Sequence, residues 1–177
     1  MTEEPTDRTA EIFETLKSFN EAGLEAKYYS CNILNSEDVA KTVDQITDDL
    51  GQVTGLVNGA GVNKPSPAIM SDKKQAEKEF NVKAIGAHNF AENLDQSRLK
   101  FFVSLTSVIG VLGMQGNAWY ALANESLDRM SRGLKAKHPK LHTVSLAYSV
   151  WAEVGMGAKL GSVDRLEEIG VSSIIPE

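Results

Sequence analysis

The chain has 177 residues, of which 42% are hydrophobic and 24% are charged, and its formal net charge is −6. A chain of this length and composition is typical of one folded globular domain, not of a disordered or fibrous protein. The acidic balance argues against nucleic acid as the main partner, and no apolar run approaches the roughly eighteen residues of a membrane span.

The first part of the chain predicts two helices separated by a strand. Residues 7–22 place apolar side chains at helical spacing, and Gly23 follows as a stop signal. Residues 25–34, EAKYYSCNIL, are rich in the residue types that favour strands. Residues 35–51 predict a second helix, with Ser36 as its N-cap and Gly51 at its end.

The rest of the chain predicts strands that alternate with helices. Residues 53–61, VTGLVNGAG, indicate a short strand that is buried on both faces and ends at glycines. A polar helix over 72–95, a strand over 100–107, a helix over 118–137 and a strand over 141–149 follow. This alternation predicts an α/β fold with a parallel sheet covered on both faces.

Small and polar residues recur where the predicted strands end. They are Asn32, the run from Asn58 to Gly61, Ser107 and Ser149. In open parallel sheets, ligands bind beyond the carboxyl ends of the strands. We therefore expect these residues to meet at one edge of the sheet and to form a binding site there.

Four residues could supply acid–base chemistry at that edge. Ser107 precedes Tyr120 by thirteen residues, and Asn124 follows one helical turn later. A tyrosine with its ordinary pKa of about 10 is a poor acid near neutral pH, so it needs a nearby cation. Lys83, on the preceding helix, is the best candidate for that cation. Ser107 would then hydrogen-bond a carbonyl oxygen and hold it against the tyrosine.

Each of these residues also has an ordinary structural explanation. Ser107 could cap a turn, Tyr120 could belong to the core, and Lys83 could be a solvated helix charge. The single cysteine, Cys31, has no basic neighbour in sequence, and with three scattered histidines it forms no metal-ligand pattern. The acidic start, MTEEPTDRTAEIF, lacks the order of a signal peptide, so the expected location is the cytoplasm.

Taken together, the motifs resemble the short-chain dehydrogenases/reductases, and above all the ketoreductase domains of modular polyketide synthases. NGAG is similar to the family's turn after a central strand, and the interval from Ser107 to Tyr120 matches. Most of the family has a lysine four residues after the tyrosine. Polyketide ketoreductases have an asparagine at that position and a lysine on the preceding helix. Asn124 and Lys83 occupy these two positions here. KAIGAHNF, GVLGMQGNAWYALANESLD and WAEVGMG resemble ketoreductase segments in the same order.

The resemblance implies a reaction and a role for each residue. NADPH would reduce a β-keto thioester carried on an acyl carrier protein. Tyr120 would donate the proton, Ser107 would orient the carbonyl, and Lys83 would lower the tyrosine pKa and hold the nicotinamide ribose. Asn124 would support Lys83 or a water-mediated proton path. The implied cofactor-binding residues are Asn32, Ile33, Asn58, Gly59, Ala60, Gly61, Lys83, Tyr120, Ser149 and Val150.

Several departures from the family pattern qualify this expectation. The resemblance implies a Rossmann-like, doubly wound parallel sheet. No predicted strand is followed by GxGxxG, so we expect this chain to lack the first βαβ unit of that fold, which carries the phosphate-binding loop. We expect residues 1–177 to form a single catalytic domain that is truncated at both ends. Alone, this domain should bind the cofactor poorly. The missing strands would come from upstream polypeptide or from a second chain. AYSVW replaces an asparagine–tryptophan–glycine–proline–tryptophan stretch. NKP, residues 63–65, stands where ketoreductases of one product class have leucine–aspartate–aspartate, and Leu112 stands where the opposite class has tryptophan. The configuration of the product is therefore undetermined.

Two other functions remain open on these grounds. One is a catalytically inactive module that shapes a megasynthase or docks a carrier domain; the missing phosphate loop and the altered AYSVW segment favour it. The other is a free-standing reductase of a small ketone or sugar, which the exchange of lysine and asparagine disfavours.

Overall fold

The computed structural model describes residues 7–153, 155–156 and 160–175, and the chain divides into two compact units, Met1–Cys31 and Asn32–Glu177. The first unit contains helix α1 (Asp7–Glu21), in agreement with the helix predicted over residues 7–22. Gly23 ends it with a positive φ of 73°, a conformation that glycine adopts without strain.

The strand predicted over residues 25–34 is wrong. The structure assigns no strand to this segment. Strand-favouring residues set only an extended backbone, whereas a strand also needs a ladder of hydrogen bonds to a neighbouring chain segment. Composition therefore suggested a strand here but could not supply its partner.

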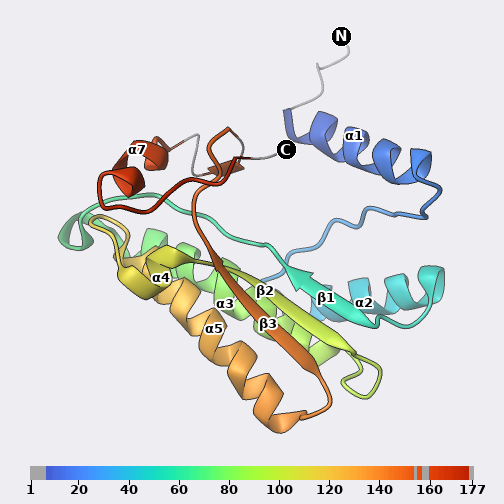
Figure 1. Ribbon diagram of the computed structural model, residues 1–177. Helices are drawn as coiled ribbons and strands as arrows, with labels where there is room; N and C mark the ends of the chain where they lie inside the picture. The colour runs from blue at the N-terminus through green and yellow to red at the C-terminus, as the bar shows by residue number, and fades with distance from the viewer. Residues whose placement is uncertain (1–6, 154, 157–159, 176–177) are drawn as a thin grey trace. The chain divides into compact units, whose positions relative to one another are not determined.

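The second unit carries the sheet and most of the helices (Figure 1). Its elements are α2 (Ser36–Leu50), β1 (Gly55–Asn58), the 3₁₀ helix η1 (Ala68–Met70), α3 (Lys73–Asn93), β2 (Phe101–Ser107), α4 (Val108–Leu112), α5 (Ala118–Lys137), β3 (His142–Tyr148) and α7 (Ser162–Glu167). The sequence prediction missed the short helices η1, α4 and α7. It also placed the cap of α2 one residue late, because the side chain of Asn35 accepts from the backbone N–H groups of Glu37 and Asp38.

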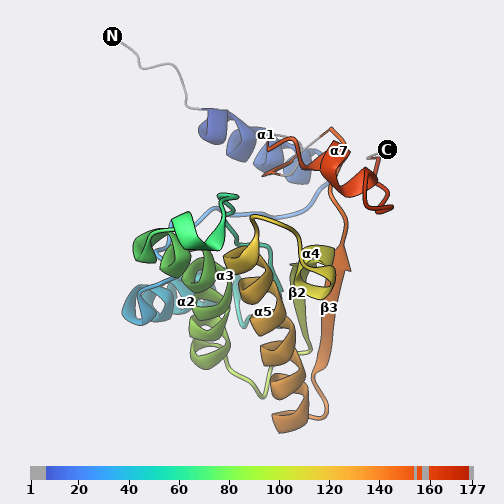
Figure 2. The ribbon, with the colours of Figure 1, turned by 90° about the vertical axis from the view of Figure 1, so that its left-hand side faces the viewer.

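The sheet is parallel, with the strand order β1-β2-β3. Asn58 pairs with Ser104, and Ser107 pairs with Tyr148, so the three strands end close to one another. Helices α2, α3 and α5 lie on one side of the sheet (Figure 2). The predicted α/β class with a parallel sheet is confirmed.

The core of this unit forms between α5 and the sheet. Phe102 on β2 and Leu127 on α5 are fully buried there, and Ser104 and Ser131 join the same two elements through their hydroxyl groups, 2.7 Å apart. Side chains on the opposite face of the sheet are exposed or half-buried, and Val57 is the clearest case at 57% exposure. The expectation that β1 is buried on both faces is therefore wrong for the described chain.

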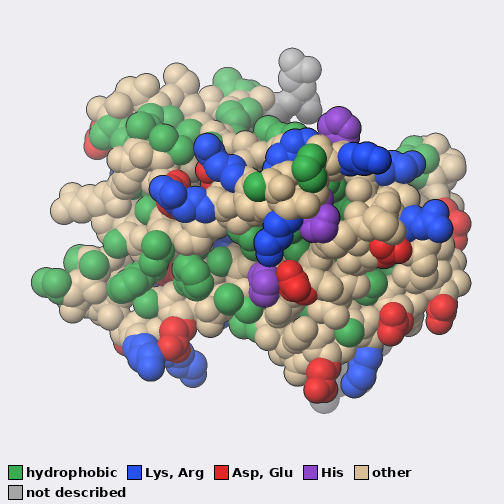
Figure 3. Space-filling model, turned by 90° about the horizontal axis from the view of Figure 1, so that it is seen from below, with side chains coloured by type: hydrophobic (Ala, Val, Ile, Leu, Met, Phe, Trp, Pro, Cys, Tyr) green, Lys and Arg blue, Asp and Glu red, His purple; other side chains and the backbone are tan. Residues whose placement is uncertain are grey.

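The end of the sheet where the strands begin is a charged surface. Seen from that side, it carries Lys, Arg and His side chains among acidic ones (Figure 3). Lys135 and Lys137 lie in the last turn of α5, where positive charge interacts favourably with the helix dipole. No helix within the described part of the chain combines the length and the apolar composition needed to cross a bilayer.

Glycine permits a close approach between α4 and α5. A Cβ atom built on Gly110 would lie 2.9 Å from Cβ of Asn124 and 3.3 Å from the backbone nitrogen of Glu125. A side chain at this position would have to displace the turn of α5 that carries Asn124. Gly133, farther along α5, has nothing within 4 Å of the equivalent position.

Two glycine substitutions should therefore have opposite effects on stability. Gly110→Val should lower the free energy of unfolding by about 1–3 kcal/mol, because the added side chain overpacks the contact between α4 and α5. Gly133→Ala should raise it by roughly 0.5–1 kcal/mol, because alanine favours an exposed helix interior. Urea unfolding of both variants checks this, and equal effects at the two positions would contradict the packing argument.

Candidate active site

A cavity of about 510 Å³ opens where the three strands end. Its walls come from the turn after β1, the ends of β2 and β3, the start of α5, and the segment around α7. The lining residues are Gly59, Gly61, Asn63, Thr106, Ser107, Ile109, Tyr120, Tyr148, Ser149, Val150, Trp151, Gly155, Met156, Ser162 and Leu166. A cavity of this size and position is typical of a small-molecule site in an α/β protein.

Lys83 is a buried cation next to this cavity. Its side chain extends from α3, is 5% exposed, and donates from Nζ to the carbonyl oxygen of Leu105 at 2.8 Å. The same Nζ lies 5.9 Å from the centroid of the Tyr120 ring. A Cβ atom on Gly61 would come within 3.5 Å of Nζ, so the glycine turn leaves room for the ammonium group.

Burial changes the acid–base behaviour of this lysine. Desolvation lowers the pKa of Lys83 from 10.5 to about 8, because water no longer stabilises the charged form. The group is therefore still mostly protonated at neutral pH, and it releases its proton more easily than an exposed lysine does.

Tyr120 is the third residue of α5, and its ring lines the cavity. Burial raises the pKa of its phenol above the usual value of 10.0, and the nearby polar side chains of Asn124 and Ser107 oppose that rise. The sequence resemblance implied that Lys83 lowers this pKa. In the structure the net direction is upward, because desolvation of the phenolate dominates.

Ser107 and Asn124 both make hydrogen bonds that fix the backbone around the site. The side chain of Ser107 caps α4 by accepting from the N–H of Ile109 at 3.2 Å, while Ser107 also lines the cavity. Nδ2 of Asn124 donates to the carbonyl oxygen of Tyr120 at 2.7 Å. Among the described residues, Oδ1 of Asn124 has no hydrogen-bond partner. The direct bond that Asn124 makes is thus to the backbone of Tyr120, whereas support of Lys83 remains a prediction.

The predicted cofactor-binding residues divide into two groups. Gly59, Gly61, Ser149 and Val150 line the cavity, together with Tyr120. Asn58 is buried beside them, where its Oδ1 accepts from the N–H of Ala60 at 3.3 Å and its Nδ2 lies 3.5 Å from the carbonyl oxygen of Lys83. Asn58 therefore holds the shape of the glycine turn next to Lys83.

Asn32 and Ile33 are not among the residues that line the cavity. Oδ1 of Asn32 accepts from the N–H of Leu34 at 3.2 Å, in the turn that leads into α2. Ile33 packs against Gly86 of α3, and its carbonyl oxygen accepts from Nδ2 of Asn89 at 2.8 Å. The structure gives both residues a structural role, and their contact with a cofactor stays a prediction.

The structure adds residues that the sequence prediction did not place in the site. Asn63 and Met156 line the cavity, as does Tyr148, the last residue of β3, whose ring packs edge-on to Trp151 with 6.1 Å between centroids. The sequence signal for Tyr148 was its place in AYSVW, the segment that corresponds by resemblance to the ketoreductase stretch beside the nicotinamide. Within the described ranges, no three His, Cys, Asp or Glu side chains gather closely enough to hold a metal ion.

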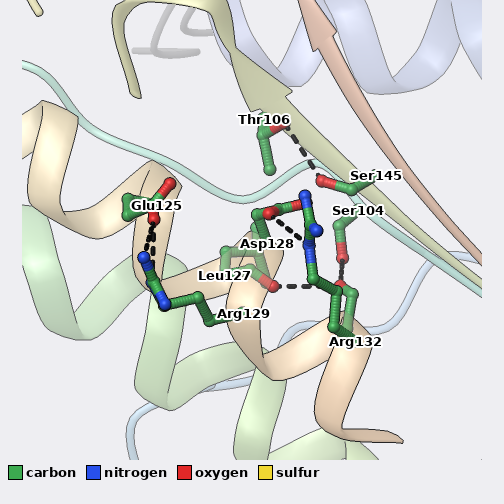
Figure 4. Close-up of polar contacts among 9 residues, drawn as sticks. Ser104, Thr106, Glu125, Leu127, Asp128, Arg129, Arg132 and Ser145 are labelled. Carbon is green, nitrogen blue, oxygen red and sulfur yellow. Dashed lines mark hydrogen bonds and ion pairs between the residues drawn. The ribbon is translucent and has the colours of Figure 1, made fainter. Parts of the chain in front are cut away.

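A layer of polar contacts lies beneath the cavity, where β2 and β3 meet α5 (Figure 4). The hydroxyl groups of Thr106 and Ser145 lie 3.3 Å apart across the two strands. On α5, Arg132 donates to Asp128 at 2.8 Å, one helical turn away. The contact in this layer that joins β2 to α5 is the one between the hydroxyl groups of Ser104 and Ser131, 2.7 Å apart.

Residues 3–153 match the family model of the KR domain. The chain belongs to this family. KR domains are the ketoreductase domains of polyketide synthases, within the short-chain dehydrogenases/reductases, and this assignment confirms the family inferred from the Lys83, Ser107, Tyr120 and Asn124 pattern.

Curated relatives of this KR domain are much longer synthases. The chain is 30% identical over 156 residues to the polyketide synthase GfsB of Streptomyces halstedii, covering 88% of this chain and 3% of that protein. It is 28% identical over 167 residues to a component of the polyunsaturated fatty acid synthase of Thraustochytrium sp., covering 94% of this chain and 6% of that protein. The chain thus spans only a few per cent of the length of these relatives.

A solved structure supports the fold assignment. The KR domain superposes on a ketoreductase domain from the bacillaene assembly line with a TM-score of 0.82 and 26% identity. The match covers 96% of this chain and 41% of that structure. The Rossmann-like α/β fold class predicted from the sequence is confirmed.

The buried charge of Lys83 leads to a test of stability against pH. Lys83→Met should raise the free energy of unfolding by about 1–2 kcal/mol at pH 7, because the folded state no longer holds a desolvated ammonium group. Between pH 8 and 10.5 the unfolded chain binds more protons than the folded chain at this position, so the wild type gains stability as pH rises. The advantage of the variant should therefore shrink across that window.

Urea unfolding at several pH values measures this difference. Lys78→Met removes an exposed lysine from the same helix and is the control. An advantage of Lys83→Met that stays constant from pH 7 to pH 10.5 would show that burial does not perturb the lysine.

Proposed function

We propose that this KR domain catalyses the NADPH-dependent reduction of a β-ketoacyl thioester, carried on an acyl carrier protein, to the β-hydroxyacyl thioester. The observation that carries the proposal is the position of the Lys83 ammonium group, 5.9 Å from the Tyr120 ring, at a cavity that Ser107 and Tyr120 both line. A buried phenol, a hydroxyl and a cation around one cavity are what proton donation to a developing alkoxide requires.

The side chains can divide the work of the reaction as follows. The hydroxyl of Ser107 donates a hydrogen bond to the substrate carbonyl oxygen and orients it. As the carbonyl carbon gains a hydride, its oxygen gains charge, and the O–H of Tyr120 transfers its proton there. Burial raises the pKa of Tyr120, so the phenol starts the reaction protonated. Lys83 is close enough to stabilise the phenolate that remains.

The residues around the cavity fit the nicotinamide end of the proposed cofactor. Gly61 leaves open space beside the Lys83 ammonium group, where a ribose hydroxyl could bind, and Gly59 also lines the cavity. The buried hydroxyl of Ser149 has no hydrogen-bond partner among the described residues and is available to a polar ligand group. When bound, NADPH supplies the hydride. Asn32, Ile33, Asn58 and Ala60 complete the proposed cofactor-binding set.

The proposed partner is a carrier protein within a larger synthase, because the curated relatives are named as polyketide and fatty acid synthases. We propose further that β1, an edge strand in the described sheet, pairs with strands from polypeptide outside this sequence. The expected cytoplasmic location is part of the same proposal.

The inactive docking module remains the second candidate. The absence of a GxGxxG motif from the sequence and the replacement of the usual segment by AYSVW favour it. Titration with NADPH separates the two functions, in the chain alone and in the presence of a glycine-rich βαβ segment of a ketoreductase. Binding under either condition supports the reductase, whereas no binding under both conditions supports the docking module.

Replacement of the proposed acid should abolish the chemistry and leave the fold intact. Tyr120→Phe should lower kcat by about 10²–10⁴-fold, as expected when a general acid is lost, with little change in KM. The assay follows NADPH oxidation with a β-ketoacyl thioester as substrate, with the glycine-rich βαβ segment present. Tyr28→Phe, at an exposed tyrosine, is the control and should be fully active. Full turnover by Tyr120→Phe would exclude this tyrosine as the proton donor.

A further inference from the structure

Glu79 is a buried acid to which the proposed reaction assigns no role. Its side chain is 3% exposed on α3, one helical turn before Lys83. Two donors converge on its Oε1: the side-chain amide of Gln75 at 2.7 Å and the backbone N–H of Lys64 at 3.2 Å. A carboxylate is costly to remove from water, so its burial here calls for a physical explanation.

The bond to Lys64 ties α3 to a loop that forms one wall of the cavity. Within this loop, which comprises residues 63–66, Asn63 lines the cavity. Nδ2 of Asn63 donates to Oδ1 of Asn117 at 2.9 Å, and the N–H of Ser66 donates to the carbonyl oxygen of Gly116 at 2.8 Å. The loop is therefore bonded on one side to Glu79 and on the other side to the segment that precedes α5.

These bonds form a continuous connection between the two proposed catalytic groups. Asn117 is the buried N-cap residue of α5, and Tyr120 follows three residues later. At the other end, Glu79 and Lys83 share one face of α3 because they are four residues apart. We propose that Glu79 is a positioning residue, whose buried carboxylate ties the loop of residues 63–66 to α3 and so sets Tyr120 against Lys83 across the cavity.

The chemistry of the site favours a carboxylate for this task. Both neighbours are N–H donors, and an ionised carboxylate only accepts hydrogen bonds, so no donor hydrogen of its own is left without a partner. Its negative charge also acts on Tyr120. The Glu79 charge contributes to the raised pKa of the phenol, together with burial and Tyr148. Lys83 is the cation that faces the same ring.

The inference rests on the proposed reduction, because a positioning role needs a reaction to serve, but the connection itself can be measured without catalysis. Hydrogen–deuterium exchange of the folded chain, in the absence of substrate, reports the backbone N–H groups of Lys64 and Ser66. Glu79→Leu should speed exchange at Lys64 by about tenfold, as the loss of one buried hydrogen bond would, and should also speed exchange at Ser66. Glu79→Gln retains an acceptor oxygen and should stay near the wild-type rate.

Two further variants keep the test decisive. Glu77→Gln removes a charge from the exposed side of the same helix and should change neither exchange nor activity. Asn63→Ala cuts the connection at its other end, and it should speed exchange at Lys64 even if Glu79→Leu does not fold. Two results would overturn the proposal. One is an unchanged exchange rate at Lys64 in both Glu79→Leu and Asn63→Ala when both variants fold. The other is exchange at Lys64 that is equally fast in Glu79→Gln and Glu79→Leu.

Activity and titration then separate positioning from simple structural support. In the reductase assay, Glu79→Leu should lower kcat by about tenfold or more per folded molecule, and Glu79→Gln should restore most of it. The titration of Tyr120, taken as the absorbance difference from Tyr120→Phe in each background, should shift to lower pH in Glu79→Gln. The proposal would also be overturned if the Tyr120 titration were unshifted in Glu79→Gln and kcat were unchanged in Glu79→Leu. Faster exchange together with no reductase activity, even when the glycine-rich βαβ segment is supplied, would refute the function and support the connection.

Discussion

The buried ammonium group of Lys83 is the constraint on which the candidate site depends. Its bond to the carbonyl oxygen of Leu105 joins the middle of α3 to the carboxyl end of β2. Desolvation makes this an unfavourable place for a charge, as the lowered pKa of about 8 shows. Unfavourable burial of this kind is typical of functional sites, where a position needed for chemistry is kept at a cost in stability.

The other polar residues of the site also maintain the backbone that positions them. Ser107 caps α4, Asn58 closes the glycine turn after β1, and Asn124 bonds to the carbonyl oxygen of Tyr120. Each side chain is thereby restrained by neighbouring backbone, and little conformational entropy is left to lose when a ligand binds. The structural and functional explanations of these residues are complementary, because the same hydrogen bonds serve both.

Two buried charged side chains of α3 lie near Tyr120, whose phenol keeps its proton at neutral pH. A buried acid, Glu79, and a buried base, Lys83, lie one turn apart on the helix and both act near Tyr120. Desolvation and the acid favour the neutral phenol, while the ammonium group favours the phenolate. The proposed reduction needs this balance, since the phenol would be protonated before the reaction and its conjugate base would have to be tolerated afterwards.

The sequence by itself determined the four longer helices α1, α2, α3 and α5, the three strands and the family, because helical spacing, capping residues and short motifs are local patterns. It also predicted Lys83, Ser107, Tyr120 and Asn124 as one set. In the fold, Ser107 and Tyr120 line one cavity, Nζ of Lys83 lies 5.9 Å from the Tyr120 ring, and Asn124 bonds to the Tyr120 backbone. It failed at residues 25–34, where strand propensity cannot specify a pairing partner, and it missed Glu79. Only the tertiary structure decided that Asn63 meets Asn117, fifty-four residues away, and that Glu79 anchors the loop between them. No local pattern encodes such contacts, because they exist only once α3, α5 and the sheet have packed together.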